Sequence, residues 1–517
     1  MPEARATRMV KVDGEHLELA DVRAVAAGAT AVLAPAARER CERAAETLQR
    51  AVAGGEALYG INTGFGPFAR TRVPDGDIEA LQVNLIRSHA AGFGEPLPVP
   101  VVRAMLVLRA HSLTRGYSGV GPALPEALLA LLAHNLIPVV PSQGSVGASG
   151  DLMPLAHIGL ALLGEGEVFH AGTRKQAAAA LQQAGLRPHR FAMKEGLALV
   201  NGTQMMTAGG ILASSEAQLV LHAAQVGAAM SVEAMLGSVA AFDAGVQALR
   251  GHAGQIAVGA NLRALLQGSA IVASHADCAR VQDAYSLRCT PQVLGASQDV
   301  LRWVEGVLQI EADAVTDNPL VFPEDGRVIS GGNFHGQPLA LALDALGVAV
   351  AEVASLSERR LHRLLHDHDV EALPRCLTPR PGLQSGLMML QYLAAALVSE
   401  NRTALHPAAA DNVVTGGGVE DHNSMGSIAA VRLPRLLHNA RGAIAAELIA
   451  AAQALEFHAP LAPSPATAAA LQAVRRFVPR LEDDRSLAPD IAALAATSAL
   501  ENVVAAAVSA MKEPLAP

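Results

Sequence analysis

Residues 144–151 read GSVGASGD, and they separate an apolar run at 136–140 from a helix-like segment that begins at Leu152. A stretch with this many glycines cannot continue either regular element, so it predicts a sharp loop before a helix. Because Gly150 has no side chain, its backbone nitrogen can approach and attack the carbonyl of Ala148. Loss of two water molecules, one of them from Ser149, would leave a methylidene-imidazolone ring with an electrophilic carbon. An ordinary turn is the alternative, since small polar residues are common in turns.

Two other interpretations of this loop are disfavoured by its spacing. A phosphate-binding loop ends in Gly-Lys-Ser or Gly-Lys-Thr, whereas Asp151 follows Gly150 here. A hydrolase nucleophile elbow needs a glycine two residues after its serine, and that position is again Asp151. A helix predicted over 151–164 would start beside Gly150, so its positive end would draw electron density towards the loop. This placement favours an electrophile.

The composition favours helices. Of the 517 residues, 51% are hydrophobic, 3% are aromatic and 17% are charged. A chain rich in alanine and leucine suits close helix packing more than a sheet, which prefers β-branched and aromatic residues. The low charged fraction also favours burial of helix surfaces against other subunits, which points to an oligomer.

Charge and cysteine content exclude several classes of protein. The formal net charge is −9, so there is no basic footprint for nucleic acid. The four cysteines, Cys41, Cys278, Cys289 and Cys376, lie far apart without paired spacing, which indicates free thiols rather than a zinc site or disulfides. The first 22 residues mix charges of both signs and lack a signal-peptide core, and no apolar run suits a membrane span. We expect a cytoplasmic small-molecule enzyme.

Candidate functional side chains before residue 210 lie in three segments. Residues 58–67, LYGINTGFGP, must form a loop, and loops on rigid scaffolds often carry function. Tyr59 lies in this loop, although a buried tyrosine with a satisfied hydroxyl has the same pattern. Ser88 and His89 fall at the end of a predicted helix, where a histidine also suits the helix dipole. Asn201 lies in a polar turn that suits the cap of the next helix.

Three candidates follow further along the chain. Gln282, Tyr285 and Arg288 recur at a spacing of three, which sets an amide, a phenol and a guanidinium on one side of a helical or 3₁₀ turn. A planar guanidinium suits a substrate carboxylate, and simple surface exposure is the alternative.

The last candidates lie in two glycine-rich segments. Phe334, among glycines and polar residues after a predicted short hairpin, looks like a wall of a site. Residues 416–426, GGGVEDHNSMG, combine two carboxylates, one of them Glu420, with an imidazole. Adjacent residues do not share a helical face, so we predict no metal site.

Periodicity and turn residues predict the secondary structure. We expect a short strand pair over 8–20 around Asp13-Gly14 and helices over 36–54, 77–89, 101–113, 125–134, 151–164, 205–240, 338–361, 386–401 and 433–457, with further helices within 475–511.

These motifs together resemble the aromatic amino acid ammonia-lyases, and most of all the enzymes that act on histidine. The resemblance runs from about residue 10 to residue 495. It is carried by YGINTGFG at 59–66, SHAAG at 88–92, the loop at 144–152, NGTQ at 201–204, YSLRC at 285–289, GGNFH at 331–335 and EDH at 420–422. Several long motifs in the same order favour the ring over an ordinary turn.

The resemblance implies a fold and a cofactor. It implies an all-α architecture with an N-terminal region over 1–220, which carries the ring and the Tyr59 loop, and a long helical bundle over 221–517. The bundle would form the core of a homotetramer whose sites are built from several subunits. The ring would form autocatalytically from Ala148, Ser149 and Gly150, so no external cofactor is expected.

The resemblance also assigns roles to residues. Tyr59 matches the base that takes the β-proton, which implies neighbouring donors or a helix end that stabilise the phenolate, because a phenol is a poor base at neutral pH. The other matches are Arg288 as the carboxylate anchor, Asn201, Gln282 and Tyr285 as orienting residues, Phe334 as an aromatic wall, and His89 and Glu420 as partners of the substrate side chain or amine.

Ser88-His89 and Glu420 favour histidine as the substrate. Lyases for phenylalanine and tyrosine typically carry Phe-Leu or His-Leu at the first pair and Gln at the second site. An imidazole can exchange hydrogen bonds with both residues, whereas a benzene ring would leave them unpaired at about 1 to 3 kcal/mol each. The expected reaction is conversion of L-histidine to trans-urocanate and ammonia, a step of histidine catabolism.

Three departures from the family pattern keep alternatives open. Gly416-Gly417-Gly418-Val419 replaces a more polar segment, Gly336-Gln337 stands where the second residue is commonly Glu, and Arg87 replaces an apolar residue. A tyrosine or phenylalanine ammonia-lyase, a lyase for a histidine derivative, or a 2,3-aminomutase would use the same ring. An inactive helical scaffold is the alternative from another class, and the intact ring triplet with Tyr59 argues against it.

Overall fold

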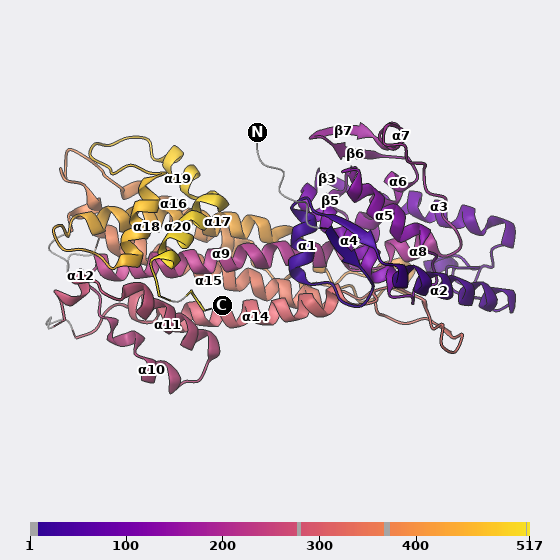
Figure 1. The fold of residues 1–517 in the computed structure, drawn as a ribbon, viewed down its shortest axis with the longest axis horizontal. Helices are drawn as coiled ribbons and strands as arrows, with labels where there is room; N and C mark the ends of the chain where they lie inside the picture. Colours follow the sequence, from indigo (N-terminus) through magenta and orange to yellow (C-terminus); the bar gives the residue numbers. More distant parts are fainter. Residues whose placement is uncertain (1–8, 277–280, 367–372, 513, 517) are drawn as a thin grey trace. The chain divides into compact units, whose positions relative to one another are not determined.

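The computed structural model describes residues 9–276, 281–366, 373–512 and 514–516 (Figure 1). It is mainly helical, as predicted. The chain divides into two compact units. Unit 1 comprises Met1–Leu212, Glu305–Asp344 and Pro407–Val431, and unit 2 comprises Ala213–Val304, Ala345–His406 and Arg432–Pro517. The division by function into 1–220 and 221–517 stays a prediction.

Unit 1 begins with short strands and helices. These are β1 (Met9–Val12), α1 (Leu19–Ala26), β2 (Thr30–Leu33), α2 (Pro35–Ala53), α3 (Ile78–His89), β3 (Phe93–Pro96), α4 (Val99–Thr114), α5 (Ala123–Ala133), β4 (Ile137–Pro138), β5 (Pro141–Gln143), α6 (Leu152–Leu162), β6 (Glu167–His170), β7 (Thr173–Gln176), α7 (Ala177–Gln183) and α8 (Glu195–Val200). The hairpin β8 (Leu320–Val321) and β9 (Val328–Ile329) and the 3₁₀ turn η6 (Gly416–Gly418) complete the shorter elements used below.

Four long helices contribute residues to both units: α9 (Gln204–Ala234), α14 (Thr290–Ala312), α15 (Gln337–His366) and α17 (Gly426–Glu456). The helices that lie in unit 2 are α10 (Ala244–Ala248), α11 (Ala253–Leu266), α12 (Ala270–Ala273), α13 (Tyr285–Arg288), α16 (Met388–Thr403), α18 (Pro465–Arg475), α19 (Ala488–Leu494) and α20 (Thr497–Ser509).

The strand pair expected over 8–20 was wrong. Asp13-Gly14 does turn the chain, but β1 pairs in parallel with β2, with Met9 opposite Thr30. The segment between them forms α1, whose buried residues Leu19, Val22 and Val25 follow a helical spacing. A parallel pair needs such a crossover, whereas an antiparallel hairpin does not.

In unit 1, helix α4 lies buried at the centre of a first group of packed helices. Every residue from Val102 to Thr114 is buried, and the helix packs against α1, α2 and α5. Helices α3, α6 and α8 pack against one another. This second group positions the functional loops, because α3 ends at His89 and α6 begins directly after the loop at 144–151.

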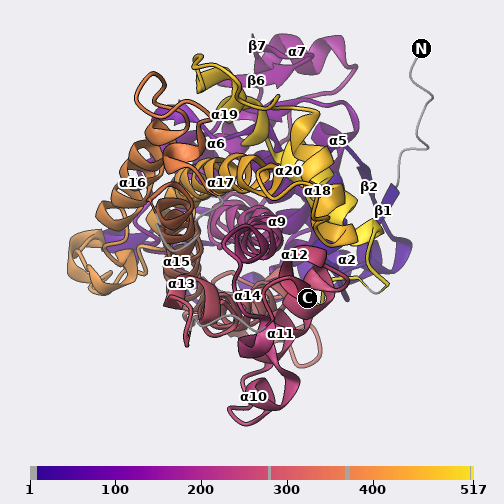
Figure 2. The ribbon, with the colours of Figure 1, turned by 90° about the vertical axis from the view of Figure 1, so that its left-hand side faces the viewer.

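In unit 2, α9 is the central helix, with α14, α15 and α17 around it (Figure 2). Ala217 and Leu221 of α9 meet residues of α14 and α15 at a small apolar gap. Glu447 on α17 forms an ion pair with Arg360 on α15, and both side chains are fully buried. Ser231 on α9 donates a hydrogen bond of 2.8 Å to the same carboxylate. Such a paired network satisfies charges that would be costly to bury alone.

Among the described residues, α15 is the one unbroken helix that is long and apolar enough to cross a membrane. Its most apolar window is 67% buried inside the protein. This burial is typical of a core helix of a soluble protein.

Candidate active site

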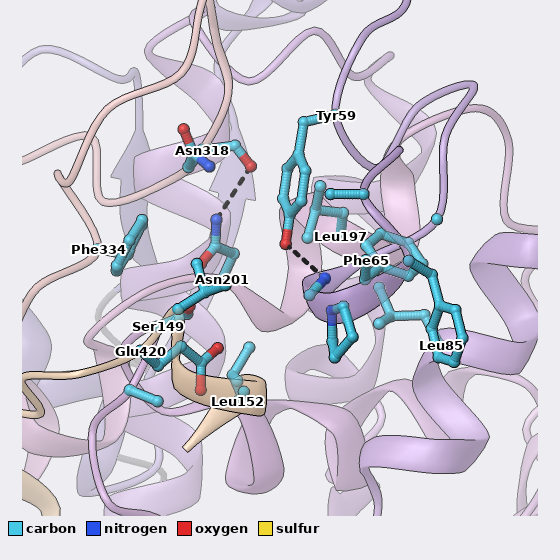
Figure 3. Close-up of a pocket in the computed structure, with 18 of the residues that line it drawn as sticks. Tyr59, Phe65, Leu85, Ser149, Leu152, Leu197, Asn201, Asn318, Phe334 and Glu420 are labelled. Carbon is cyan, nitrogen blue, oxygen red and sulfur yellow. Dashed lines mark hydrogen bonds between the residues drawn. The ribbon is translucent and has the colours of Figure 1, made fainter. Parts of the chain in front are cut away.

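A cavity of about 1270 Å³ lies in unit 1. Its walls come from segments that are far apart in sequence. The predicted residues that line it are Tyr59, Ser88, His89, Ala148, Ser149, Asn201, Phe334 and Glu420. Figure 3 shows Tyr59, Asn201, Ser149, Phe334 and Glu420 around one space, with Phe65 and Leu85 on the other side of Tyr59.

The loop at 144–151 has a backbone that requires glycine at two positions. Gly147 and Gly150 have φ values of +70° and +73°. A Cβ on Gly150 would overlap the carbonyl of Gly202, and a Cβ on Gly147 would overlap the Ser424 hydroxyl. Nothing larger than glycine fits this approach. The residues present therefore fit a ring formed from 148–150.

Asp151 ties this loop to two helices. Its buried carboxylate accepts hydrogen bonds from the backbone N–H groups of Met205 (2.8 Å) and Met206 (3.0 Å) at the start of α9, and from the Ser427 hydroxyl (2.9 Å) on α17. Burial raises the pKa of Asp151 to about 7. Asp151 thus serves as the cap of α9. The expectation that Asn201 caps this helix was wrong, because α8 ends directly before Asn201 and α9 begins at Gln204.

Tyr59 presents its hydroxyl to the cavity. The backbone N–H of Gly66 donates a hydrogen bond of 3.2 Å to the phenolic oxygen (Figure 3). The ring packs edge-on against Phe65, with centroids 6.3 Å apart. Gly60 has a φ of +65°, and a Cβ there would lie 2.6 Å from Leu197. The loop thus supplies a backbone donor to the phenolic oxygen.

His89 has a defined hydrogen-bonding pattern. Its Nδ1 lies 2.9 Å from the carbonyl oxygen of Leu85 and 3.0 Å from the Ser88 hydroxyl. Because a carbonyl only accepts, Nδ1 carries the hydrogen, and in the neutral ring Nε2 is left as an acceptor. The neighbouring departure, Arg87, forms an ion pair with Glu165 and does not line the cavity.

His157 on α6 supports the chain after His89. Its Nε2 accepts a hydrogen bond of 3.1 Å from the backbone N–H of Gly92. Burial lowers the pKa of His157, which keeps the ring neutral and able to accept. A Cβ on Gly92 would lie 2.9 Å from the same Nε2. This contact was not predicted, because nothing in the sequence pairs residues 92 and 157.

Asn201 lies against Asn318, which was not predicted to be a site residue. The Asn201 side-chain amide donates a hydrogen bond of 3.0 Å to the Asn318 carbonyl (Figure 3). The Asn201 Oδ1 is buried and has no hydrogen-bond partner among the described residues. Asp317, which precedes Asn318 in the chain, forms a fully buried ion pair with Lys194 at 2.6 Å. A buried acceptor without a partner at a cavity wall is suited to a ligand donor.

Phe334 and Glu420 lie on the cavity wall formed by the hairpin region and the 416–422 loop. His335 and His422, which the sequence did not single out individually, stack with ring centroids 5.8 Å apart. The His335 Nε2 lies 3.0 Å from the His422 carbonyl. Gly336, which precedes the departure at Gln337, packs closely, since a Cβ there would lie 2.6 Å from the Met206 side chain.

Gln282, Tyr285 and Arg288 lie in unit 2 and are not among the residues that line the cavity. They do gather on one side, as their spacing predicts. Arg288 donates a hydrogen bond of 2.9 Å to Gln282, and its guanidinium lies 4.8 Å from the centroid of the Tyr285 ring. Tyr285 is 72% exposed. Their role towards a substrate stays a prediction.

Within the described part of the chain, no group of three or more His, Cys, Asp or Glu residues could hold a metal ion. Cys41, Cys289 and Cys376 are free thiols, and Cys278 lies outside the described residues.

Comparisons with known proteins agree with this geometry. A family model described as aromatic amino acid lyase matches residues 17–476. The chain is 50% identical over 493 residues to a histidine ammonia-lyase of Anaeromyxobacter sp. (strain K), covering 93% of this chain and 97% of the relative. The structure of histidine ammonia-lyase from Trypanosoma cruzi matches with a TM-score of 0.89 at 38% identity, covering 98% of this chain and 96% of that one.

The structure of tyrosine aminomutase from Streptomyces globisporus is similar as well. It matches with a TM-score of 0.92 at 36% identity and covers 98% of this chain and 100% of that one. The family model, the sequence relatives and the similar structures all agree. The chain belongs to the aromatic amino acid lyase family, which implies an internally formed methylidene-imidazolone.

Proposed function

We propose that this protein is a histidine ammonia-lyase, a carbon–nitrogen lyase that converts L-histidine to trans-urocanate and ammonia without oxidation. The observation that carries the proposal is the cavity that gathers Tyr59, His89, Ser149 and Glu420 in a chain half identical to a histidine ammonia-lyase. A cytoplasmic location and a homotetramer go with this proposal.

The proposed cofactor is the ring formed from Ala148, Ser149 and Gly150. When formed, it supplies an electrophilic carbon that turns the substrate amine into a better leaving group. The protein contributes the backbone approach at Gly150 and the burial of Asp151, which keep the triplet in place. Preorganisation of this kind avoids reorganisation during the reaction.

Tyr59 is the proposed base for the β-proton. The Tyr59 hydroxyl faces the cavity. Tyr59 acts as a base in its phenolate form, and the hydrogen bond from the Gly66 N–H stabilises this phenolate. Asn201 orients the substrate and the ring through its unpartnered oxygen. Phe334 is the aromatic wall beside them.

Ser88, His89 and Glu420 are the proposed selectors of the imidazole. The His89 Nε2 acceptor can take the one N–H of a neutral imidazole, and the Glu420 carboxylate can meet the amine or take the second N–H of a protonated ring. A benzene ring offers neither donor, so it would leave polar groups unpaired in the cavity.

Gln282, Tyr285 and Arg288 are the proposed anchors of the substrate carboxylate. The guanidinium supplies paired N–H groups for a carboxylate. We place this role in the tetramer, where the site is completed by residues of more than one subunit.

A substrate panel tests the function. Purified protein is given L-histidine, L-tyrosine and L-phenylalanine while ammonia and the conjugated product are measured. Urocanate from histidine is expected, and its absence would overturn the assignment. Mass measurement of the peptide that contains residues 144–151 should show loss of two waters. Full activity with an unmodified peptide would refute the ring.

A 2,3-aminomutase is the second candidate, because the chain is 36% identical to a tyrosine aminomutase of the same fold. This enzyme would return the amine to the β-carbon. Chromatography of the products separates a β-amino acid from urocanate and free ammonia.

A further inference from the structure

We propose that Thr415 is a positioning residue for Glu420, with Gly416 making room for that side chain, and that the two together determine how the cavity selects its amino acid. The inference rests on the proposed function, since it gives Glu420 contact with the substrate.

The loop folds back on itself at these residues. The Thr415 backbone N–H donates to the Glu420 carbonyl at 2.9 Å, and Gly418 N–H donates to the Thr415 carbonyl at 3.0 Å. The two chain segments thus form an isolated antiparallel bridge around η6. The Thr415 hydroxyl donates a hydrogen bond of 2.7 Å to the Glu420 Oε2. Across the described residues, this is the one hydrogen bond to the carboxylate, so the other oxygen is left for a ligand.

Asn423 fixes the direction of the Thr415 hydroxyl. Its side-chain amide donates to the Val413 carbonyl at 2.6 Å and to the Thr415 oxygen at 3.2 Å. Since the oxygen accepts from Asn423, its own hydrogen is available for Glu420. Asn423 is 1% exposed, and its backbone N–H donates to the Asn412 side chain at 2.8 Å. Asn423 therefore orients Glu420 through the Thr415 hydroxyl.

Gly416 is required by the position of Glu420. It has a φ of +57°, and a Cβ there would lie 2.7 Å from the Glu420 Cδ and 2.9 Å from Oε2. Gly418 has a φ of +91°, but a Cβ there would meet no atom within 4 Å. Both glycines have a positive φ, and of the two only Gly416 would bring a Cβ against the carboxylate. This contact gives a physical reason for glycine at position 416, the first residue of the segment that departs from the family pattern.

Thr415→Val removes the hydroxyl and keeps the shape of the side chain. We expect kcat/KM for L-histidine to fall by about 10- to 100-fold, since hydrogen bonds to charged groups have this weight. The ratio of kcat/KM for L-histidine to that for L-phenylalanine should fall in parallel. Thr415→Ser should restore both within about threefold. Thr403→Val, which removes an exposed hydroxyl bonded to the Glu400 carbonyl, is the matched control and should change neither.

The two glycines give a second comparison. Gly416→Ala and Gly418→Ala both place an alanine at a positive φ, but only the first should lower kcat/KM and the histidine preference. Equal losses in both variants would overturn the proposal, because they would trace the effect to strain in the loop. In all variants the 144–151 peptide should keep the same mass as in the unchanged protein, which reports an intact fold around the ring.

A double-mutant cycle tests whether Thr415 acts through Glu420. In a Glu420→Gln protein, Thr415→Val should lower the logarithm of kcat/KM by less than about half of the amount by which it does so in the unchanged protein. Additive losses would contradict the proposal. The cycle is measured as kcat/KM for the amino acid that the unchanged protein deaminates best. It is then repeated with the affinity for free imidazole, measured by calorimetry. Absence of urocanate would therefore reject the proposed function and still leave Thr415 tested.

Discussion

Among the residues that the structure describes, the Tyr59 hydroxyl has one hydrogen bond, and its donor is a backbone N–H. No side-chain substitution can replace a backbone donor directly, so the hydrogen bond to the phenolic oxygen depends on the shape of the 58–67 loop. The loop shape in turn depends on Gly60, where a Cβ would meet Leu197.

Tyr59→Phe keeps the edge-on packing of the ring against Phe65 and removes the proposed base. We expect kcat to fall by about 10²- to 10⁴-fold, as is typical when a general base is lost, while KM for L-histidine changes little. Steady-state kinetics measure both constants. If the 144–151 peptide of this variant is unmodified, the loss of activity comes from failed ring formation instead. An unchanged kcat would reject Tyr59 as the base.

The pKa of Asp151, raised to about 7 by burial, predicts a pH dependence of stability. The folded protein favours the protonated carboxyl, so this contribution is complete below the ordinary value of 3.8 and is lost as pH rises through 7. Asp151→Asn keeps an uncharged group there. The stability of this variant relative to the unchanged protein should therefore rise between pH 5 and pH 8, measured as urea midpoints. A constant difference would show that Asp151 is ionised throughout.

Helix α6 connects two parts of the site. Its first residues follow the ring triplet, and His157, in the middle of the helix, accepts from Gly92 behind Ser88-His89. A displacement of this helix would move the proposed electrophile and the proposed imidazole partner together. The element therefore couples chemistry to recognition.

His157→Phe should lower kcat/KM for L-histidine several-fold, and His157→Gln, which keeps an acceptor, should retain more of it. Burial lowers the pKa of His157, so its contact is present above the ordinary value of 6.5 and is lost as pH falls through the lowered value. The unchanged protein should lose activity at the acidic side, and the Gln variant should lose less there. Superimposable pH–rate profiles would contradict this role.

Sequence periodicity predicted most of the long helices, because each has one face that must be buried. Among the longer helices it missed α11, the 23-residue α14 and α18. It also missed α1 and gave β1 the wrong partner, since short amphipathic segments and parallel pairing carry weak local signals. Motif order predicted eight residues that line the cavity. The contacts that hold them could not be predicted: Asp151 meets Ser427 across 276 positions of the chain. Only folding brings such residues together.

At the scale of the whole molecule, the exposed Tyr285 and the partly exposed Arg288 belong to unit 2 and are not among the residues that line the cavity. The proposed homotetramer accounts for them as contributions to a site on another subunit. Light scattering should give a mass of four times the 53.3 kDa chain.

Subunit complementation tests shared sites. Tyr59→Phe and Arg288→Ala proteins should each be nearly inactive. Mixed and reassembled, they should recover part of the activity, because some sites would receive an intact Tyr59 and an intact Arg288 from different chains. Recovery without reassembly would exclude this explanation, and no recovery in verified mixed tetramers would place both residues in one chain's site.

Unit 1 is assembled from three stretches of chain, and the last of them, Pro407–Val431, carries Glu420, Ser424 and Ser427. A ribosome must therefore synthesise more than four-fifths of the protein before the catalytic unit has all its parts. The N-terminal layer around α4 can condense early, while the Gly147 and Asp151 contacts wait for the distant segment. Nascent chains that stop short of residue 407 would thus hold an unfinished pocket, and the timing of translation sets the earliest moment at which the enzyme can mature.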